Sequence, residues 1–107
     1  MFCKKSDKNC KDVLEGVKLK TLVHGDKTSM HQFILKKGAT IPVHKHSHEQ
    51  TGFMVSGQMN FNIGGEKFVA ETGDSWSIPG DMEHSVYVIE DAVVVEVFSP
   101  VREDYLK

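Results

Sequence analysis

Residues 38–57 read GATIPVHKHSHEQTGFMVSG, a stretch that begins and ends in glycine and is rich in histidine. Every second residue from His44 to His48 is a histidine, and Gln50 continues the same alternation. Successive side chains of an extended backbone point to opposite faces, so a strand here would place these side chains on one face. The stretch therefore predicts a group of donor atoms with a common direction.

The alternating histidines have the spacing of metal ligands. Neutral imidazole is a common ligand for zinc, iron, nickel and copper, and two rings spaced i, i+2 on a strand can bind one ion. A further ligand would come from elsewhere in the chain, and His84 is the natural candidate. It follows the turn-forming tripeptide Pro-Gly-Asp at residues 79–81, which can direct the next strand's first residue back toward the interior.

The residues after this stretch give the clearest local prediction. Apolar residues alternate strictly in 58–63, so Met59, Phe61 and Ile63 are expected to share one buried face. The dipeptide Gly64-Gly65 follows at once and supplies the positive φ angles that a two-residue hairpin turn requires. These residues predict a β-hairpin.

Most of the chain consists of short runs rich in Val, Ile, Phe or Thr, which indicate strands at residues 17–24, 30–35, 53–56, 58–63, 66–70, 75–78, 85–89 and 92–98. Turn-forming residues lie between most of them, at 25–26, 37–38, 73–74, 79–81 and 90–91. A helix is expected only within residues 7–15, and it would be short. The pattern predicts an all-β sandwich or barrel.

Length and composition limit the classes of protein to consider. A chain of 107 residues suits one domain, 1–107, with a polar N-terminal extension at 1–15. It is 39% apolar and 26% charged, as a globular protein should be. The net charge of −2, with both signs spread along the chain, argues against nucleic acid as a partner, and the N-terminal lysines are interpreted as a solvated tail.

The location of the protein is predicted from what the sequence does not contain. Its first residues form no apolar run typical of a signal peptide, and no window reaches membrane-spanning length. A cytoplasmic protein with no membrane partner is expected. Cys3 and Cys10 are then expected to be free thiols, because the cytoplasm is reducing.

Two motifs resemble those of the cupin family. Residues 38–57 match G-x5-H-x-H-x3-Q-x6-G, and residues 73–84 match G-x5-P-x4-H. The resemblance implies a double-stranded β-helix, a jelly-roll-like antiparallel barrel, with its motifs over residues 38–104. It also implies one divalent transition metal ion, whose ligands would be His44, His46, Gln50 and His84. The metal could be Ni, Mn, Fe, Zn or Co.

Gln50 departs from the family pattern, which usually has glutamate there. Three imidazoles and an amide leave the full charge of the ion uncompensated, which makes it a better Lewis acid for anionic ligands. The amide also disfavours an oxygenase, because non-haem iron oxygenases generally use a carboxylate beside two histidines. His48 shares the parity of the ligands but lies off the motif. It is interpreted as a residue of the barrel rim or one beside the ligands; the alternative is a register shift that makes His48 a ligand in place of His44.

The last predicted strand contains one carboxylate. Glu96 shares a face with Val94 and Phe98 in an otherwise apolar run. Either Glu96 points to solvent from an edge strand, or it faces the metal cavity as a proton acceptor and donor. The methionines and Trp76 are interpreted as core or as lining of a pocket.

Within the cupins, the run HSHEQ at 46–50 together with FSPVREDYL at 98–106 resembles the pectin-degradation, or uronate-linearising, group. This resemblance implies that Glu96, Phe98 and Arg102 complete an active site, although the acid in that group is more typically aspartate. It also implies conversion of 4,5-unsaturated monouronates, which are small anionic sugars, to open-chain keto forms, and a homodimer.

Two other functions are considered on the same scaffold, since a fold does not fix chemistry. One is a metal-containing cupin that binds a small molecule without turnover. The other is a cupin dioxygenase or another sugar isomerase. A regulatory cupin normally carries a DNA-binding extension, for which this length leaves no room.

Overall fold

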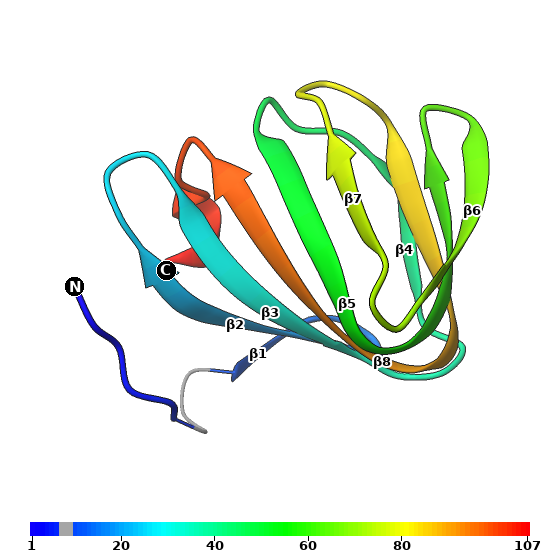
Figure 1. Ribbon diagram of the computed structural model, residues 1–107, viewed down its shortest axis with the longest axis horizontal. Coiled ribbons are helices and arrows are strands. Elements are labelled where there is room, and N and C mark those ends of the chain that lie inside the picture. Colours follow the sequence, from blue (N-terminus) through cyan, green and yellow to red (C-terminus); the bar gives the residue numbers. More distant parts are fainter. Residues whose placement is uncertain (7–9) are drawn as a thin grey trace.

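The computed structural model describes residues 1–6 and 10–107, and strands dominate it (Figure 1). The strands are β1 (Cys10–Leu14), β2 (Val17–His24), β3 (Ser29–Leu35), β4 (Thr40–His44), β5 (Glu49–Ile63), β6 (Glu66–Glu71), β7 (Ser75–Ile78) and β8 (His84–Ser99). Within the described residues a single turn of 3₁₀ helix, η1 (Glu103–Tyr105), follows the last strand. The predicted all-β fold is confirmed.

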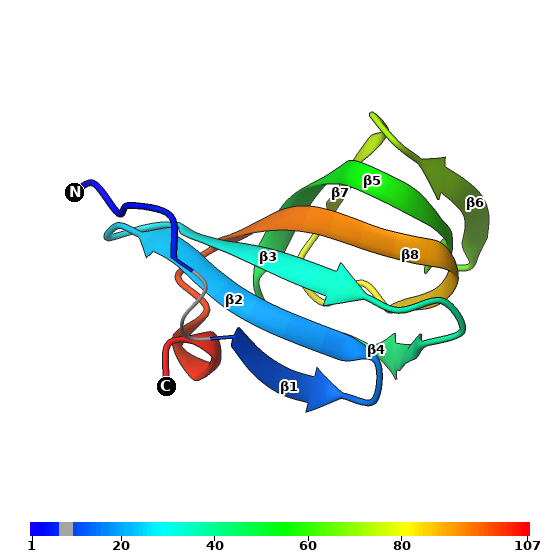
Figure 2. The same ribbon diagram turned by 90° about the horizontal axis from the view of Figure 1, so that it is seen from below.

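Two long strands, β5 and β8, form the centre of the sheet. They pair antiparallel along their whole length, from Glu49 opposite Ser99 to Ile63 opposite His84. One half of β5 also pairs with β7 and the other with β6, while β8 pairs with β4 and then with β3. The main path is β1-β2-β3-β8-β5-β6. Because each long strand changes its outer neighbour halfway along, the sheet curves around an interior, as Figures 1 and 2 show.

The bend in the sheet lies at Gly57. Its φ of 101° is a conformation that side chains rarely adopt, and a Cβ here would collide with the carbonyl oxygen of Asp91 and lie 2.5 Å from Ala92 Cα. The β5–β8 register also shifts at several points between Met54 and Met59. Such irregularities bend a strand without ending it. The turn predicted at residues 90–91 is therefore wrong, because β8 continues through it.

The alternation of apolar residues places the core as expected. Met59 and Phe61 are buried and Ile63 is half-buried, all facing the interior. Gly64 and Gly65 have φ angles of 58° and 89° and close the predicted two-residue hairpin between β5 and β6. The core draws on nearly every strand, with Val17, Leu19, Phe33, Leu35, Met54, Met59, Phe61, Ala70, Ile78, Val86, Val88, Ala92, Val94 and Phe98.

Two segments differ from the sequence-based prediction. The helix expected within 7–15 is wrong for residues 10–14, which form β1; residues 7–9 lie outside the described part. β1 pairs antiparallel with β2, the next strand along the chain, and this hairpin pairing outweighs the expected helix. The extended run expected over 44–50 is also interrupted, because β4 ends at His44 and β5 begins at Glu49.

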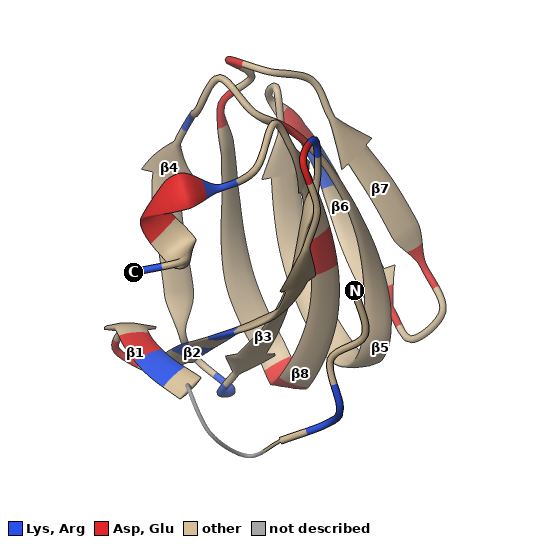
Figure 3. Cartoon of the chain, turned by 90° about the vertical axis from the view of Figure 1, so that its left-hand side faces the viewer, with Lys and Arg blue, Asp and Glu red and all other residues tan. Residues whose placement is uncertain are grey.

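Charged residues of both signs are dispersed over strand ends, turns, β1 and η1, and Figure 3 shows no face given to one sign. Cys3 and Cys10 are exposed and unpaired, as predicted. In the part of the chain that the structure describes, no helix has the length and apolar character needed to cross a membrane.

The geometry at Gly57 predicts a specific loss of stability. Gly57→Ala should lower the free energy of unfolding by at least about 3 kcal/mol, because strained backbone and a collision with β8 act together. Gly65→Ala is the matched control, since Gly65 also has positive φ but nothing within 4 Å of a Cβ. It should lose about 1 kcal/mol from strain alone. Urea unfolding measures both, and equal losses would contradict the proposed collision.

Candidate metal centre and its cavity

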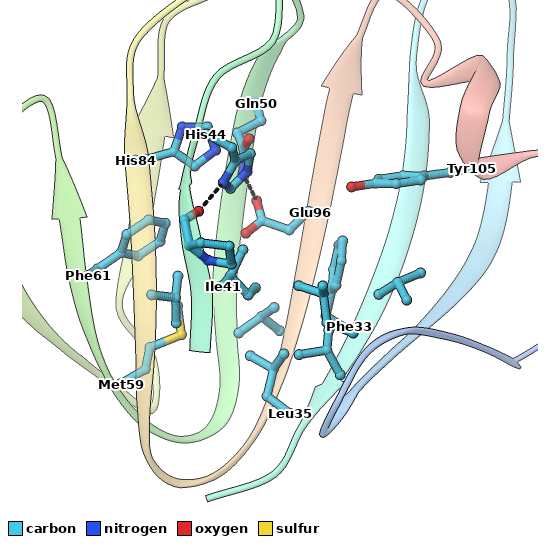
Figure 4. A pocket seen from close by; sticks show the side chains of 16 residues that line it. Phe33, Leu35, Ile41, His44, Gln50, Met59, Phe61, His84, Glu96 and Tyr105 are labelled. Atoms are coloured by element: carbon cyan, nitrogen blue, oxygen red, sulfur yellow. Dashed lines mark hydrogen bonds between the residues drawn. The ribbon is translucent and has the colours of Figure 1, made fainter. Parts of the chain in front are cut away.

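Three histidines meet at one end of the barrel. His44 is the last residue of β4 and pairs with His84, the first residue of β8, while His46 lies in the connection that follows β4. One nitrogen from each ring lies within 4.8 Å of the others. Figure 4 shows His44 and His84 beside Gln50 at the polar end of a cavity. The sheet thus brings together the three imidazoles that the sequence predicted as ligands.

The same hydrogen bond orients each of these rings. Nδ1 of His44, His46 and His84 lies 2.8, 2.9 and 2.8 Å from the carbonyl oxygens of Pro42, His48 and Met82, respectively. A carbonyl only accepts, so Nδ1 carries the proton and Nε2 keeps its lone pair. Metal-binding histidines are commonly oriented in this way by backbone carbonyls. The residues present therefore fit a metal ion bound through three Nε2 atoms.

The position of Gln50 supports the same conclusion. Its Nε2 donates to Glu96 Oε2 at 3.1 Å, which turns Oε1 toward His46 Nε2 at 2.8 Å. In the tautomer just derived, both of these atoms are acceptors. Two acceptors at this distance need a positive centre to which both can donate electron density. A divalent cation shared by the Gln50 amide oxygen and the imidazoles satisfies that requirement.

Burial favours the neutral form of His46 and His84. It is the largest cause of the lowered pKa of His84, about 4, and it also lowers the pKa of His46. The Arg102 guanidinium lowers both further. Neutral rings with free lone pairs are the form in which histidine binds metals. At neutral pH His46 and His84 therefore need no deprotonation before they can bind an ion.

His48 does not join the cluster of three histidines. Its carbonyl accepts the hydrogen bond from His46, and its ring packs against His46 and Phe98 with centroid distances of 5.6 and 6.3 Å. Its Nδ1 is buried and has no hydrogen-bond partner among the described residues. This placement agrees with the interpretation of His48 as a residue beside the ligands.

Glu96 faces the interior. The solvent-facing alternative is wrong, because β8 lies between β3 and β5 rather than at an edge and Glu96 is 5% exposed. Its carboxylate accepts hydrogen bonds from Trp76 Nε1 at 3.1 Å and from Gln50. Burial raises the pKa of Glu96 to about 8, against the lowering effect of these two hydrogen bonds. A carboxyl group with this pKa can both accept and donate a proton near neutral pH.

Sequence reasoning missed two parts of this arrangement. Trp76 was expected to line the core or a pocket, but its indole N–H also binds Glu96. Gly52 leaves the space for this contact, because a Cβ there would collide with the Trp76 indole and lie 2.5 Å from Glu96 Oε2. The β5 pairings with β7 and β8 place Trp76 and Glu96 on either side of Gly52, which no local pattern reveals.

A cavity of about 310 Å³ extends from the histidines into the barrel. Its polar groups, from His44, Gln50, His84, Glu96 and Tyr105, adjoin apolar walls formed by Val13, Leu14, Val17, Phe33, Leu35, Ile41, Pro42, Met59, Phe61, Val86 and Val94. In Figure 4 the Tyr105 hydroxyl points from the opposite wall toward Glu96. The size is at the lower end of the range for small-molecule sites, which suits a single small ligand.

Phe98 and Arg102 lie next to the cavity. Phe98 is buried, with its ring 5.6 Å from that of His46, and the Arg102 guanidinium carbon lies 5.0 Å from the Phe98 ring. The guanidinium also stacks on Tyr105 at 4.1 Å, and its Nε donates to Asp104 at 2.9 Å. The residues implied by the narrower resemblance are thus neighbours, but Tyr105, which was not singled out, forms the cavity wall.

Comparison with known proteins gives a family. The model of the family described as "Cupin domain" matches residues 31–99. The chain belongs to the cupin family. Both predicted cupin motifs lie inside the matched region, and the barrel agrees with the fold expected of a cupin.

Individual cupins add detail. The pectin degradation protein KdgF of Dickeya dadantii is 33% identical over 94 residues, 86% of each protein. The structure of KdgF from Halomonas sp. matches with a TM-score of 0.91 at 28% identity, covering 97% of this chain and 96% of that one. An RmlC-like cupin from Shewanella frigidimarina matches with a TM-score of 0.92 at 26% identity, covering 98% and 96%. The resemblance to pectin-degradation cupins is therefore confirmed.

The ring geometry predicts how metal content depends on each histidine. His46→Ala and His84→Ala should each lose most of the bound divalent metal, because each removes an oriented Nε2 donor. His48→Ala is the matched control and should retain about one ion per chain. Elemental analysis of protein purified without chelator measures all three variants. Equal loss in His46→Ala and His48→Ala would contradict this ligand set.

Proposed function

We propose that this cupin acts in pectin degradation as a metal-dependent enzyme that converts 4,5-unsaturated monouronates to their linear keto forms without a redox change. The observation that carries the proposal is Glu96, a buried carboxyl with a pKa raised to about 8 that adjoins the histidine cluster and the cavity. The two KdgF relatives support the assignment to pectin degradation.

The ion would be held by His44, His46, Gln50 and His84. When bound, it supplies a Lewis acid that attracts oxygen donors of an anionic sugar. All four ligands are neutral, so the protein itself compensates little of the ionic charge. The site is consequently suited to a negatively charged substrate.

Glu96 would carry the proton of the reaction. The substrate is a cyclic enol ether closed as a hemiacetal, and Glu96 would remove the proton from its anomeric hydroxyl. The C1–O1 bond becomes a carbonyl as the bond from C1 to the ring oxygen breaks, leaving an enolate. Return of the proton to C4 then gives the ketone at C5. The product is an isomer of the substrate, so no oxidant or reductant is needed.

Arg102 would bind the substrate carboxylate, because its planar guanidinium can donate two parallel hydrogen bonds. Asp104 and the rings of Phe98 and Tyr105 hold the guanidinium in place. Phe98 would act through this packing, since it separates Arg102 from His46. The positive charge of Arg102 adds to the attraction for a monouronate.

The other functions considered have less support. A dioxygenase is disfavoured by Gln50, because non-haem iron oxygenases generally use a carboxylate beside two histidines, and the Gln50 oxygen lies next to His46 while its amide binds Glu96. A buried carboxyl in the cavity wall favours proton transfer over binding alone. Anaerobic incubation with a panel of unsaturated monouronates, followed by loss of ultraviolet absorbance against a control without protein, tests turnover directly. Metal-loaded protein that gives no rate above background would contradict the proposed reaction.

The role of Glu96 predicts a large fall in kcat on substitution. Glu96→Gln keeps the shape of the side chain but cannot transfer the proton, and general acid–base catalysis is worth roughly 10²- to 10⁴-fold. Steady-state kinetics on a 4,5-unsaturated galacturonate, corrected for the spontaneous reaction, measure the fall. Metal content should stay at the parent level, and a variant as active as the parent would remove Glu96 from proton transfer.

The role of Arg102 predicts a different kinetic effect. Arg102→Lys retains the charge but loses the two-point geometry, so KM should rise by roughly 10-fold while kcat changes less. The same assay measures both constants. A fall in kcat with unchanged KM would argue against binding of the substrate carboxylate by Arg102.

A further inference from the structure

One buried polar side chain has no part in the proposed reaction. His31 lies on β3 with an exposed fraction of 0%. Its Nδ1 is 2.9 Å from Thr21 Oγ1 on β2, and its Nε2 is 2.8 Å from Ser29 Oγ. Both ring nitrogens therefore have a hydroxyl partner inside the barrel.

The same two hydroxyls bind the C-terminal segment. The backbone N–H of Arg102 donates to Ser29 Oγ at 2.9 Å, and Thr21 Oγ1 donates to the carbonyl oxygen of Tyr105 at 3.1 Å. His31 thus links the hydrogen bonds at the two ends of residues 102–105. These residues place Tyr105 in the cavity wall and stack the Arg102 guanidinium on its ring.

The direction of every hydrogen bond in this chain is determined. Thr21 uses its one proton on Tyr105, so it must accept from His31 Nδ1. A neutral ring then has no proton on Nε2, which must accept the Ser29 proton, and Ser29 Oγ is left to accept from the Arg102 amide. Burial is the first cause of the lowered pKa of His31, about 4, with Arg102 adding to it, which keeps the ring neutral at physiological pH.

Besides ring packing, which includes an edge-on contact of Tyr105 with Phe98 at 5.7 Å, the C-terminal segment has few polar attachments among the described residues. The helix η1 is a single turn of three residues, with no side-chain cap at its N-terminus and no fully buried residue. The Tyr105 ring packs edge-on against His31 and Phe33 at 5.2 and 6.0 Å. Lys11 Nζ also donates to the Tyr105 carbonyl, at the longer distance of 3.4 Å. The hydrogen-bond chain is therefore the principal polar attachment of this segment to the barrel.

We propose that His31, Thr21 and Ser29 are positioning residues, which fix Arg102 and Tyr105 at the cavity through one directed hydrogen-bond chain. The inference rests on the proposed function for the role of Arg102. Ser29 binds the backbone amide of Arg102, and Tyr105 stacks on the Arg102 guanidinium. Loss of the hydrogen bond at either end of the chain therefore displaces this guanidinium. Among the described residues, none of the hydrogen bonds of this chain involves a proposed metal ligand, so its loss should affect substrate binding and leave the metal in place.

Kinetic measurements on matched variants test the proposal. Ser29→Ala removes the acceptor for Arg102, and Thr21→Val removes the donor to Tyr105 at nearly constant shape. Each should raise KM for an unsaturated galacturonate by roughly 3- to 10-fold, the value of one hydrogen bond, with a smaller change in kcat and unchanged metal content. Thr21→Ser keeps the hydroxyl and should restore a KM near that of the parent. Val88→Ala, a core change at a residue that does not line the cavity, controls for lost stability.

A double-mutant cycle separates positioning from a general structural effect. In an Arg102→Ala background, Ser29→Ala should have little further effect on KM, because the group that it positions is gone. The proposal would be overturned if Ser29→Ala raised KM equally in both backgrounds. It would also be overturned if KM in Ser29→Ala and Thr21→Val were no higher than in Val88→Ala.

Backbone amide exchange tests the chain independently of the reaction. The Arg102 amide should exchange at least roughly tenfold faster in Ser29→Ala than in the parent, whereas Val88→Ala should leave its rate relative to neighbouring amides unchanged. If the parent shows no turnover, the proposed function fails and this rate alone decides the positioning role. An Arg102 amide protected equally in the parent and in Ser29→Ala would overturn it.

Discussion

The pairing of β5 with β8 along their full length is the constraint on which the rest of the structure depends. It places Gly52 opposite Glu96 and Gln50 opposite Phe98, so residues nearly fifty positions apart meet at the end of the barrel. The same pairing bends at Gly57, where the two backbones are too close for a side chain. On the two sides of this bend, β5 and β8 pair with different outer strands. One antiparallel sheet therefore encloses both the core and the cavity.

Apart from His48 Nδ1, the buried polar side-chain atoms of the described residues have hydrogen-bond partners, as their desolvation requires. Backbone carbonyls orient His44, His46 and His84, and Trp76 and Gln50 bind Glu96. The hydrogen bonds of the three imidazoles also select the tautomer with its proton on Nδ1, so each ring presents Nε2 to the same point. The hydrogen bonds that satisfy these buried groups thus also set the tautomers and the orientation of the side chains in the site.

The C-terminal segment shows how a site can extend beyond the barrel that carries it. Residues 102–105 form little regular structure, yet they bring the Tyr105 phenol to the cavity and stack the Arg102 guanidinium on it. Their attachment passes through His31, so β2 and β3, which contribute no proposed metal ligand, still influence the site. The interior of this barrel therefore has two polar regions, one for the proposed metal ion and one that holds the wall of the cavity.

The sequence by itself determined most of the strand pattern and the hairpin at Gly64-Gly65, because alternation and turn residues are local properties. Its motifs also singled out His44, His46 and His84, but it is the sheet that brings them together. Only the tertiary structure decided that residues 10–14 form a strand, which pairs with β2, and that β5 and β8 continue through their bend, which depends on pairing with distant residues. It also decided the direction of Glu96. The alternation of side chains along a strand restricts Glu96 to one of two faces. Which of these faces is buried depends on the strands that lie on either side of β8.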